Sequence, residues 1–288
     1  MTNNVKGFIE MVNVQQGDAV HSAGEVKNVV NNYQRLSDLY SQIIVSQPFF
    51  INCYALYDKL LDKILKGKKF GTLLDVGCGG GVQTVVLAAH ADKVTGIDIS
   101  NEFVEVAKKR CSHLSNVRFQ IENACQLPFQ DNIFDGIVSY GDVLSHIIEG
   151  YELALSEMAR VVKPGGWITF EVDNKWNIGM VYVPREIKEA LKVKEKGHAT
   201  REWQGMFFKT FTPSELKRLL KKFNLEVVEW HGHNIFASLV PDRYLLEEKR
   251  TFLGSAAIFL GKIDLFLSGV FPFNRFGFNH MLIVRKRN

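Results

Sequence analysis

The fold of this chain is decided by the stretch Leu73-Leu74-Asp75-Val76-Gly77-Cys78-Gly79-Gly80-Gly81. It predicts a short apolar strand that runs into a glycine-rich turn, with a carboxylate just before the first glycine. Glycines after a strand let the backbone turn tightly and approach a ligand without an intervening side chain. A second predicted strand, Val94-Thr95-Gly96-Ile97-Asp98, ends on another acid about 20 residues downstream. The two acidic strand ends predict a site for an adenosine-containing cofactor.

The pattern of the turn argues against two other nucleotide sites. The dinucleotide fingerprint G-x-G-x-x-G needs a small residue three places after its second glycine, and Val82 stands there. No Lys-Ser or Lys-Thr pair follows the glycines, so a phosphate-binding P-loop is excluded. A carboxylate at the lip of the turn, Asp75, would repel a pyrophosphate and attract a cationic amino-acid group.

These residues resemble motif I of the class I S-adenosylmethionine-dependent methyltransferases, which reads acid-x-Gly-x-Gly-x-Gly. The resemblance implies an α/β fold with a doubly wound, mostly parallel seven-stranded sheet of the Rossmann-like type. It also implies that the turn lies under the methionine part and ribose of S-adenosylmethionine, with S-adenosylhomocysteine as product. Asp98 would accept hydrogen bonds from both ribose hydroxyls, and Ile99 would pack on the adenine.

The order of the later segments fits the same family. The segment Glu122-Asn123-Ala124-Cys125-Gln126-Leu127-Pro128-Phe129 resembles the family's "Gly-Asp-Ala…Leu-Pro-Phe". Asn123 replaces the usual Asp, and its carbonyl oxygen can still accept from the adenine amino group. Further strands are expected over 116–121, 134–139, 167–172, 226–231 and 281–285, with a helix over 214–223 that Thr212 caps. The resemblance therefore assigns the cofactor site to Asp75, Gly77, Cys78, Gly79, Asp98, Ile99, Asn123, Ala124, Ser139 and Tyr40.

The chain divides into an N-terminal arm and helical cap, 1–66, and a Rossmann-like domain, 67–288, with insertions at about 174–210 and 241–279. Helical patterning dominates from Val26 to Lys66, with a break near Gln47-Pro48. Tyr33 and Tyr40 stand one helical heptad apart. In the family a paired-tyrosine segment ahead of motif I often folds over the cofactor, but both tyrosines also fit ordinary half-buried positions. We expect the N-terminal helices and the two insertions to form a lid.

The stretch from Phe252 to Phe273 is rich in Phe, Leu and Ile, but Lys262 and Asp264 interrupt it. A membrane span needs about 20 apolar residues in a row, so we expect an amphipathic helix and no transmembrane segment. Four alternative roles remain for this helix: it packs against the core, lines an apolar substrate site, contacts a membrane surface, or forms a homodimer interface.

Candidate acceptor-site residues follow the fourth and fifth strands, because ligands of open α/β sheets bind beyond the carboxyl ends of the strands. The segment from Ser139 to His146 loosely resembles "Gly-Asn-x-x-x-His" of small-amine methyltransferases. We name His146 as a candidate general base or positioning group, since imidazole titrates near neutrality, and Asp142 and Tyr140 as further catalytic candidates. Glu171, Asp173 and Asn174 follow as a polar group after the fifth strand. His231, His233 and His280 are expected to be structural, and no metal-ligand spacing is present.

The composition of the chain and two missing motifs restrict the class of acceptor molecule. Thirty-five Lys and Arg against 31 Asp and Glu give a formal net charge of +4, too mild to require a nucleic-acid partner. After the fourth strand the chain has neither the Asn/Asp-Pro-Pro-Tyr/Phe segment of exocyclic-amine methylases nor the Pro-Cys of pyrimidine methylases. The four cysteines form no C-x-x-C pair, and the first residues do not resemble a signal peptide, which favours the cytoplasm.

The sequence therefore predicts a cytoplasmic methyltransferase that acts on a small molecule, with an apolar compound as one candidate acceptor. The alternatives are an RNA or protein methyltransferase, a non-catalytic S-adenosylmethionine-binding module, and aminopropyl transfer in the same fold.

Overall fold

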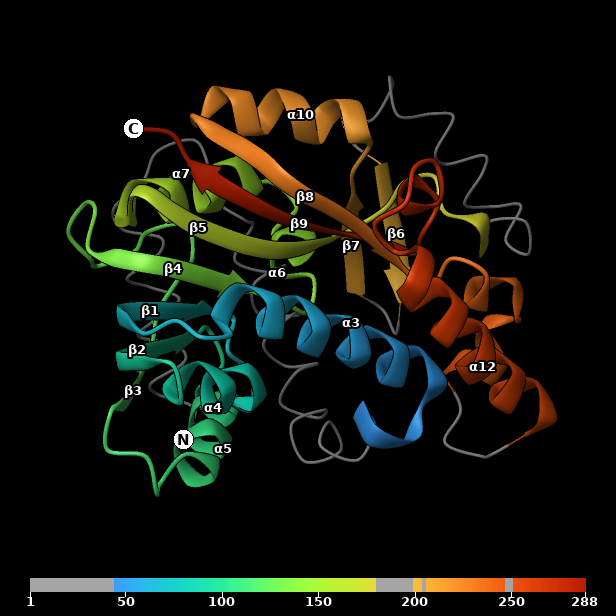
Figure 1. Cartoon of the computed structure of the whole chain (residues 1–288), viewed down its shortest axis with the longest axis horizontal. Coiled ribbons are helices and arrows are strands. Elements are labelled where there is room, and N and C mark those ends of the chain that lie inside the picture. Colours follow the sequence, from blue (N-terminus) through green and yellow to red (C-terminus); the bar gives the residue numbers. More distant parts are fainter. Residues whose placement is uncertain (1–43, 180–198, 204–205, 247–250) are drawn as a thin grey trace.

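A single seven-stranded sheet forms the centre of the molecule (Figure 1). The computed structural model describes residues 44–179, 199–203, 206–246 and 251–288. The sheet has the order β3-β2-β1-β4-β5-β9-β8, and its strands are β1 (Phe70–Val76), β2 (Ala91–Asp98), β3 (Val117–Ile121), β4 (Phe134–Ser139), β5 (Val162–Asp173), β8 (Leu225–His233) and β9 (Asn279–Lys286). The first five are parallel to one another, and β9 is antiparallel to both β5 and β8. The expected doubly wound, mostly parallel sheet is confirmed.

The direction of the strands gathers distant residues at one edge. Because β8 and β5 are both antiparallel to β9, β8 runs in the same direction as the parallel strands. The carboxyl ends of β1, β2, β4, β5 and β8 therefore share an edge with the start of β9. At this edge Asn279 is paired with both Asp173 and His233.

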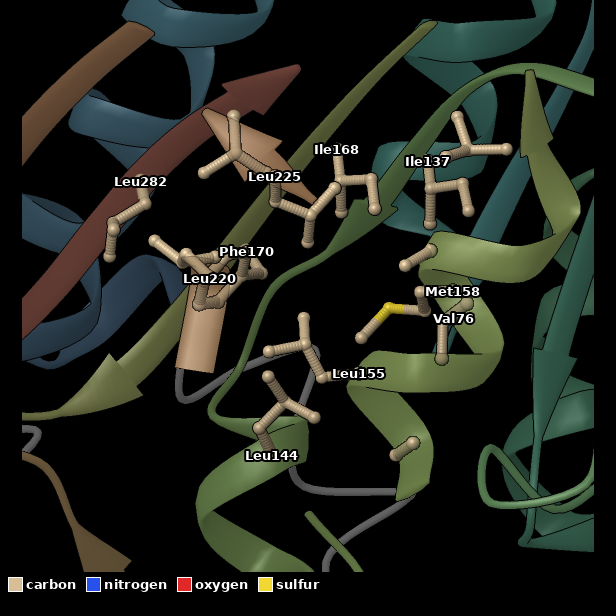
Figure 2. Close-up of a cluster of buried hydrophobic side chains, with 14 of the residues drawn as sticks. Val76, Ile137, Leu144, Leu155, Met158, Ile168, Phe170, Leu220, Leu225 and Leu282 are labelled. Atoms are coloured by element: carbon tan, nitrogen blue, oxygen red, sulfur yellow. The ribbon is translucent and has the colours of Figure 1, made fainter. Parts of the chain in front are cut away.

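Helices cover both faces of the sheet, which explains the nearly continuous apolar runs of its central strands. On one face Leu74 and Ile137 share a buried cluster with Met158. Figure 2 shows Ile137 and Met158 in this cluster. Their neighbours along the strands, Leu73 and Val138, belong to the cluster on the opposite face. The helices that supply these layers are α3 (Pro48–Leu65), α4 (Val82–Ala88), α5 (Asn101–Arg110), α7 (Tyr151–Val161) and α10 (Pro213–Lys222).

Two helix starts agree with the sequence signals. Gln47 is the extended N-cap of α3 and Pro48 is its first residue, which confirms the predicted break. The Thr212 hydroxyl accepts the backbone N–H of Glu215 at 3.1 Å and caps α10.

The two insertions contain structure of their own. The first holds an antiparallel pair, β6 (Ala199–Trp203) and β7 (Met206–Thr210), which the sequence did not reveal. The second holds the helix α12 (Phe252–Leu267), preceded by η2 (Ala237–Leu239) and α11 (Asp242–Leu245) and followed by η3 (Phe273–Arg275). Figure 1 shows α12 beside α3.

The contact between α12 and α3 is close. A Cβ added at Gly261 would lie 2.0 Å from Oδ1 of Asn52, so any other residue there would displace the Asn52 side chain. Among the described residues no helix has the length and apolar character to cross a membrane. The lid and the division at residues 66 and 67 stay predictions, and Tyr33 and Tyr40 lie outside the described residues.

Candidate active site

The glycine turn joins β1 to α4 and needs glycine for two reasons. Gly77, Gly79 and Gly81 have φ values of 68°, 49° and 77°, in the left-handed region that other residues avoid. A Cβ at Gly77 would also lie 2.3 Å from a methyl carbon of Val143, in the helix α6 (Val143–His146) that follows β4. The turn therefore touches the segment that carries the candidate acceptor residues.

The two predicted carboxylates lie on either side of this turn. Asp98, at the end of β2, accepts the backbone N–H groups of Gly79 and Ser100, each at 2.9 Å. Burial raises the pKa of the Asp98 carboxyl, and the bonds from these two amides oppose that rise. Each of the two Asp98 oxygens can accept a second hydrogen bond. The carboxylate can therefore still accept one hydrogen bond from each of two hydroxyl groups.

Asp75 is more enclosed than the sequence suggested. Its side chain is 2% exposed and accepts the Thr84 hydroxyl at 2.5 Å. Burial raises the pKa of the Asp75 carboxyl to about 7, against the effect of this hydrogen bond. A cation that reached this carboxyl would favour its ionised form.

The remaining cofactor candidates lie at or near the ends of neighbouring strands. Ile99 and Ala124 are half-buried, and Cys78 is a buried free thiol. Oδ1 of Asn123 accepts the backbone N–H of Cys125 at 2.9 Å, which leaves that oxygen one further lone pair for an adenine amino group. Their roles in binding stay predictions.

One buried hydroxyl supports a ligand at the turn. Ser139 ends β4 beside β1, and its side-chain oxygen has no hydrogen-bond partner among the described residues although it is buried. A buried polar atom left unpaired is costly. A polar group of a bound cofactor would satisfy it, so these residues fit S-adenosylmethionine.

The three candidate catalytic residues occupy different environments. Tyr140 is buried, its hydroxyl lies 3.0 Å from that of Thr169, and burial raises its pKa. Asp142 has a φ of 60° and accepts a hydrogen bond from the Asn279 amide. His146 lies at the end of α6.

The structure makes His146 a weak base. The ring is 4.4 Å from that of Phe208, centroid to centroid. Burial lowers the pKa of His146 to about 3. Its proposed role is untested.

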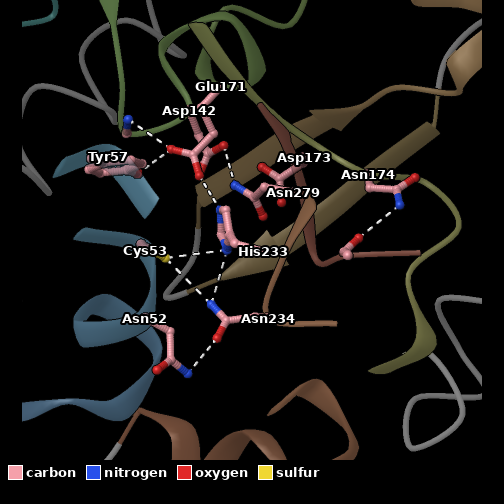
Figure 3. A network of polar contacts seen from close by, with 12 residues as sticks. Asn52, Cys53, Tyr57, Asp142, Glu171, Asp173, Asn174, His233, Asn234 and Asn279 are labelled. Carbon is pink, nitrogen blue, oxygen red and sulfur yellow. Dashed lines mark hydrogen bonds and ion pairs between the residues drawn. The ribbon is translucent and has the colours of Figure 1, made fainter. Parts of the chain in front are cut away.

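A buried polar network lies next to these residues and was not predicted as a unit (Figure 3). Glu171 of β5 is 1% exposed and accepts the Tyr57 hydroxyl, the backbone N–H of Gly141 at 3.0 Å and Nε2 of His233. On the other side of its ring, Nδ1 of His233 lies 3.5 Å from Sγ of Cys53. The network joins α3, β5, β8 and the loop after β4.

Cys53, Glu171 and His233 are also a possible metal-ligand set, since one ligand atom of each lies within 4.8 Å of the others. In the present geometry the thiol faces Nδ1 and the carboxylate faces Nε2. One metal ion binds only one of the two ring nitrogens, so the ring would have to turn to offer a common ligand point. The arrangement described here is a hydrogen-bonded chain.

The sequence pointed only partly to this network. The sequence places Glu171 in a polar group after the fifth strand, predicts a structural role for His233, counts Cys53 only among four cysteines without a C-x-x-C pair, and assigns no role to Tyr57. The available signal was a carboxylate and a histidine near the carboxyl ends of two strands. Helix α3 precedes the glycine turn by chain order, and nothing local indicates that it faces that edge.

Comparisons with known proteins agree with this geometry. The family model "Methyltransferase domain" matches residues 74–170. An uncharacterized protein of Methanocaldococcus jannaschii is 30% identical over 247 residues, covering 82% of this chain and 90% of that protein. A demethylmenaquinone methyltransferase of Staphylococcus aureus is 34% identical over 145 residues, covering 49% of this chain and 56% of that protein.

Among solved structures, a putative methyltransferase in complex with the Trm112 methyltransferase activator of Haloferax volcanii superposes with a TM-score of 0.60. It is 15% identical, and the match covers 90% of this chain and 98% of that one. This likeness shows the fold alone.

The sheet order, the glycine turn after β1 and the acid at the end of β2 define an enzyme fold of the Rossmann-like α/β class. The chain belongs to the class I S-adenosylmethionine-dependent methyltransferases. Its cofactor is S-adenosylmethionine, which supplies a methyl group from a sulfonium centre and leaves S-adenosylhomocysteine.

Proposed function

We propose that this enzyme transfers the methyl group to a small, largely apolar acceptor at the carboxyl edge of β4, β5 and β8. The observation that carries the proposal is a small polar centre enclosed by aromatic rings. Tyr57 is stacked on Tyr140 at 4.5 Å, and Phe49 contacts Phe278 at 5.0 Å and His233 at 6.0 Å between ring centroids. Sites for small molecules are mostly apolar, with a few polar groups that fix orientation.

In this proposal the residues divide by task. Asp75, Gly77, Cys78, Gly79, Asp98, Ile99, Asn123, Ala124 and Ser139 would hold the cofactor, with Tyr40 as a further candidate. Transfer is an in-line displacement, so the protein's main contribution is to hold the acceptor atom behind the methyl carbon. Positioning of this kind can supply about 7–11 kcal/mol of the barrier. Tyr140 and Asp142 would shape the acceptor side.

The similarity to demethylmenaquinone methyltransferase supports a lipid-like acceptor. That match covers about half of each chain. A macromolecular acceptor is the alternative. The formal charge of +4 argues against RNA.

The helix α12 supports contact with a membrane surface, from which an apolar acceptor would be taken. One face packs on α3, while Phe252, Phe259 and Phe266 are 87%, 64% and 80% exposed. The only charged residue exposed on this helix is Lys262, and its one acid, Asp264, is buried against the backbone N–H groups at the start of η2. An apolar face with a cation suits an anionic bilayer surface. A homodimer is the alternative.

The four cysteines are free thiols, which supports the proposed cytoplasmic location. The acceptor class is tested by incubating the protein with S-adenosylmethionine labelled in its methyl group and three separate acceptors: demethylmenaquinol, bulk tRNA and total protein. The proposal predicts label in the organic extract. Label in tRNA or protein alone would favour the macromolecular alternative, and cofactor binding without transfer would favour a non-catalytic module.

A further inference from the structure

The tautomer of a neutral His233 ring follows from two backbone carbonyls some distance from it. The Ala257 carbonyl can only accept, so the Asn52 group 3.2 Å from it is the amide nitrogen. That nitrogen also donates to Oδ1 of Asn234 at 2.9 Å. Nδ2 of Asn234 then donates to the Phe49 carbonyl at 3.2 Å and to Nδ1 of His233 at 3.1 Å. Nδ1 is therefore an acceptor, and in the neutral ring the proton is on Nε2.

This tautomer makes His233 a donor to Glu171. The carboxylate then accepts three hydrogen bonds, from Tyr57, Gly141 and His233. Among the described ion pairs Glu171 has no Lys or Arg partner. A buried carboxylate without a cation is stabilised by such donors but loses hydration that water would supply. A hydroxyl that hydrogen-bonds to the Tyr57 oxygen would be one hydrogen bond away from this carboxylate, which can act as a proton acceptor.

The network lies beside the cofactor turn. Gly141, which donates to Glu171, is two residues before Val143, and Val143 is the residue that a Cβ at Gly77 would strike. Tyr57 donates to Glu171 and stacks on Tyr140 at the end of β4. The polar centre is thus linked by short contacts to the segment next to the donor site.

We propose that Tyr57 and Glu171 take the proton of the acceptor, with His233 as the positioning residue, and that the acceptor is a hydroxyl-bearing aromatic of the naphthol or quinol class. This proposal rests on the small-molecule function proposed above. It assigns the proton transfer to a different histidine and carboxylate from the candidates His146 and Asp142.

The step balances without a further reactant. The acceptor hydroxyl donates to the Tyr57 oxygen as the Tyr57 proton moves to Glu171. The acceptor oxygen, or the ring carbon conjugated with it, forms a bond to the methyl carbon while the carbon–sulfur bond breaks. The sulfur takes that electron pair and becomes the neutral thioether of S-adenosylhomocysteine. After methylation at oxygen, Glu171 releases the proton to solvent. After methylation at carbon, the ring proton leaves to solvent and the acceptor oxygen takes back the proton held by Tyr57 and Glu171, so one proton is released in either case.

Other titratable groups belong to the electrostatic environment of this network. Cys53 on α3 and Asp142 in the loop after β4 interact with Tyr57, and Asp264 on α12 and His280 on β9 interact with His233. None of them is altered in the variants below, so each variant reports on the removed group.

The test uses 1,4-naphthalenediol under argon with labelled S-adenosylmethionine, and 1,4-dimethoxynaphthalene as the acceptor that has no proton to lose. Wild type should methylate the diol and not the ether. Glu171→Gln should lower kcat at pH 7 by about 10²–10⁴-fold with little change in KM, the usual effect of removing a general base. Its rate should rise about tenfold per pH unit toward the hydroxyl's pKa, near 10 for a phenol. Tyr57→Phe should change the rate in the same direction, and Tyr54→Phe, one turn away on α3, should match wild type.

Calorimetry with S-adenosylhomocysteine shows whether each variant is folded. If Glu171→Gln fails to bind it, Tyr57→Phe, which keeps the ring, decides the outcome. Wild-type rates in Tyr57→Phe or Glu171→Gln, methylation of the ether, or no methylation of the diol would overturn the proposal. So would one equivalent of tightly bound zinc whose removal abolishes activity, because the same three side chains would then be metal ligands. Failure of wild type to bind S-adenosylhomocysteine would instead overturn the proposed function.

Discussion

Removal of the Asp98 carboxylate tests the cofactor site in a quantitative way. In the structure this carboxylate already accepts two backbone amides at 2.9 Å, from Gly79 and Ser100, and these bonds orient it at the end of β2. Two charge-assisted bonds to the ribose hydroxyls would each contribute about 1.5–3 kcal/mol. Asp98→Ala should therefore weaken binding of S-adenosylhomocysteine by about 3–6 kcal/mol, or about 10²–10⁴-fold in Kd.

Isothermal titration calorimetry measures this change directly. Asp92→Ala is the matched control, because Asp92 is an exposed acid on the same strand near its opposite end. It should bind with the wild-type Kd. A Kd for Asp98→Ala within threefold of wild type, in a protein that unfolds cooperatively, would refute the assignment of Asp98 to the ribose.

Three further predictions concern the turn, its buried acid and α12. Because burial raises the pKa of Asp75 to about 7, its contribution to stability is greatest below the unfolded pKa near 3.8 and is lost as pH rises toward 7. Between pH 5 and pH 8 the free energy of unfolding of wild type, measured in urea, should fall by about 2–3 kcal/mol more than that of Asp75→Asn. Equal decreases in the two proteins would contradict the burial argument. Gly77→Ala should destabilise the protein by several kcal/mol more than Gly67→Ala in the same assay. The backbone strain is matched, since φ is 68° at Gly77 and 69° at Gly67, but only a Cβ at Gly77 would strike a neighbouring side chain. Replacing Phe259 and Phe266 by Ser should abolish sedimentation with anionic vesicles and leave unfolding unchanged. An unchanged vesicle fraction, together with a shift from dimer to monomer in gel filtration, would favour a homodimer.

The part of the fold that local patterns determine was predictable. Apolar runs that end in glycine or an acid indicated the parallel strands, and β3 (Val117–Ile121) and β4 (Phe134–Ser139) lie within one residue of the expected ranges. The capping pattern at Thr212 indicated α10. These features depend on residues close together in the chain, so the sequence carries them directly.

The acceptor side depends on contacts that no local pattern contains. Tyr57 and His233 come together only because α3 packs against the carboxyl ends of β5 and β8. Both strand ends lie more than a hundred residues after Tyr57 in the sequence. His146 shows the reverse case: its place after β4 suggested a base, but tertiary packing against Phe208 buries the ring and lowers its pKa. Burial and partners, which set the chemistry of both histidines, follow from the fold and not from residue type.

A crystal structure with S-adenosylhomocysteine tests the central claim most directly. The account predicts the ribose hydroxyls within hydrogen-bond distance of Asp98, the methionine part against the turn at Gly77 to Gly79, and the sulfur directed toward Tyr140. Density for the nucleoside elsewhere on the molecule, or a ribose that leaves the Asp98 carboxylate unengaged, would contradict it.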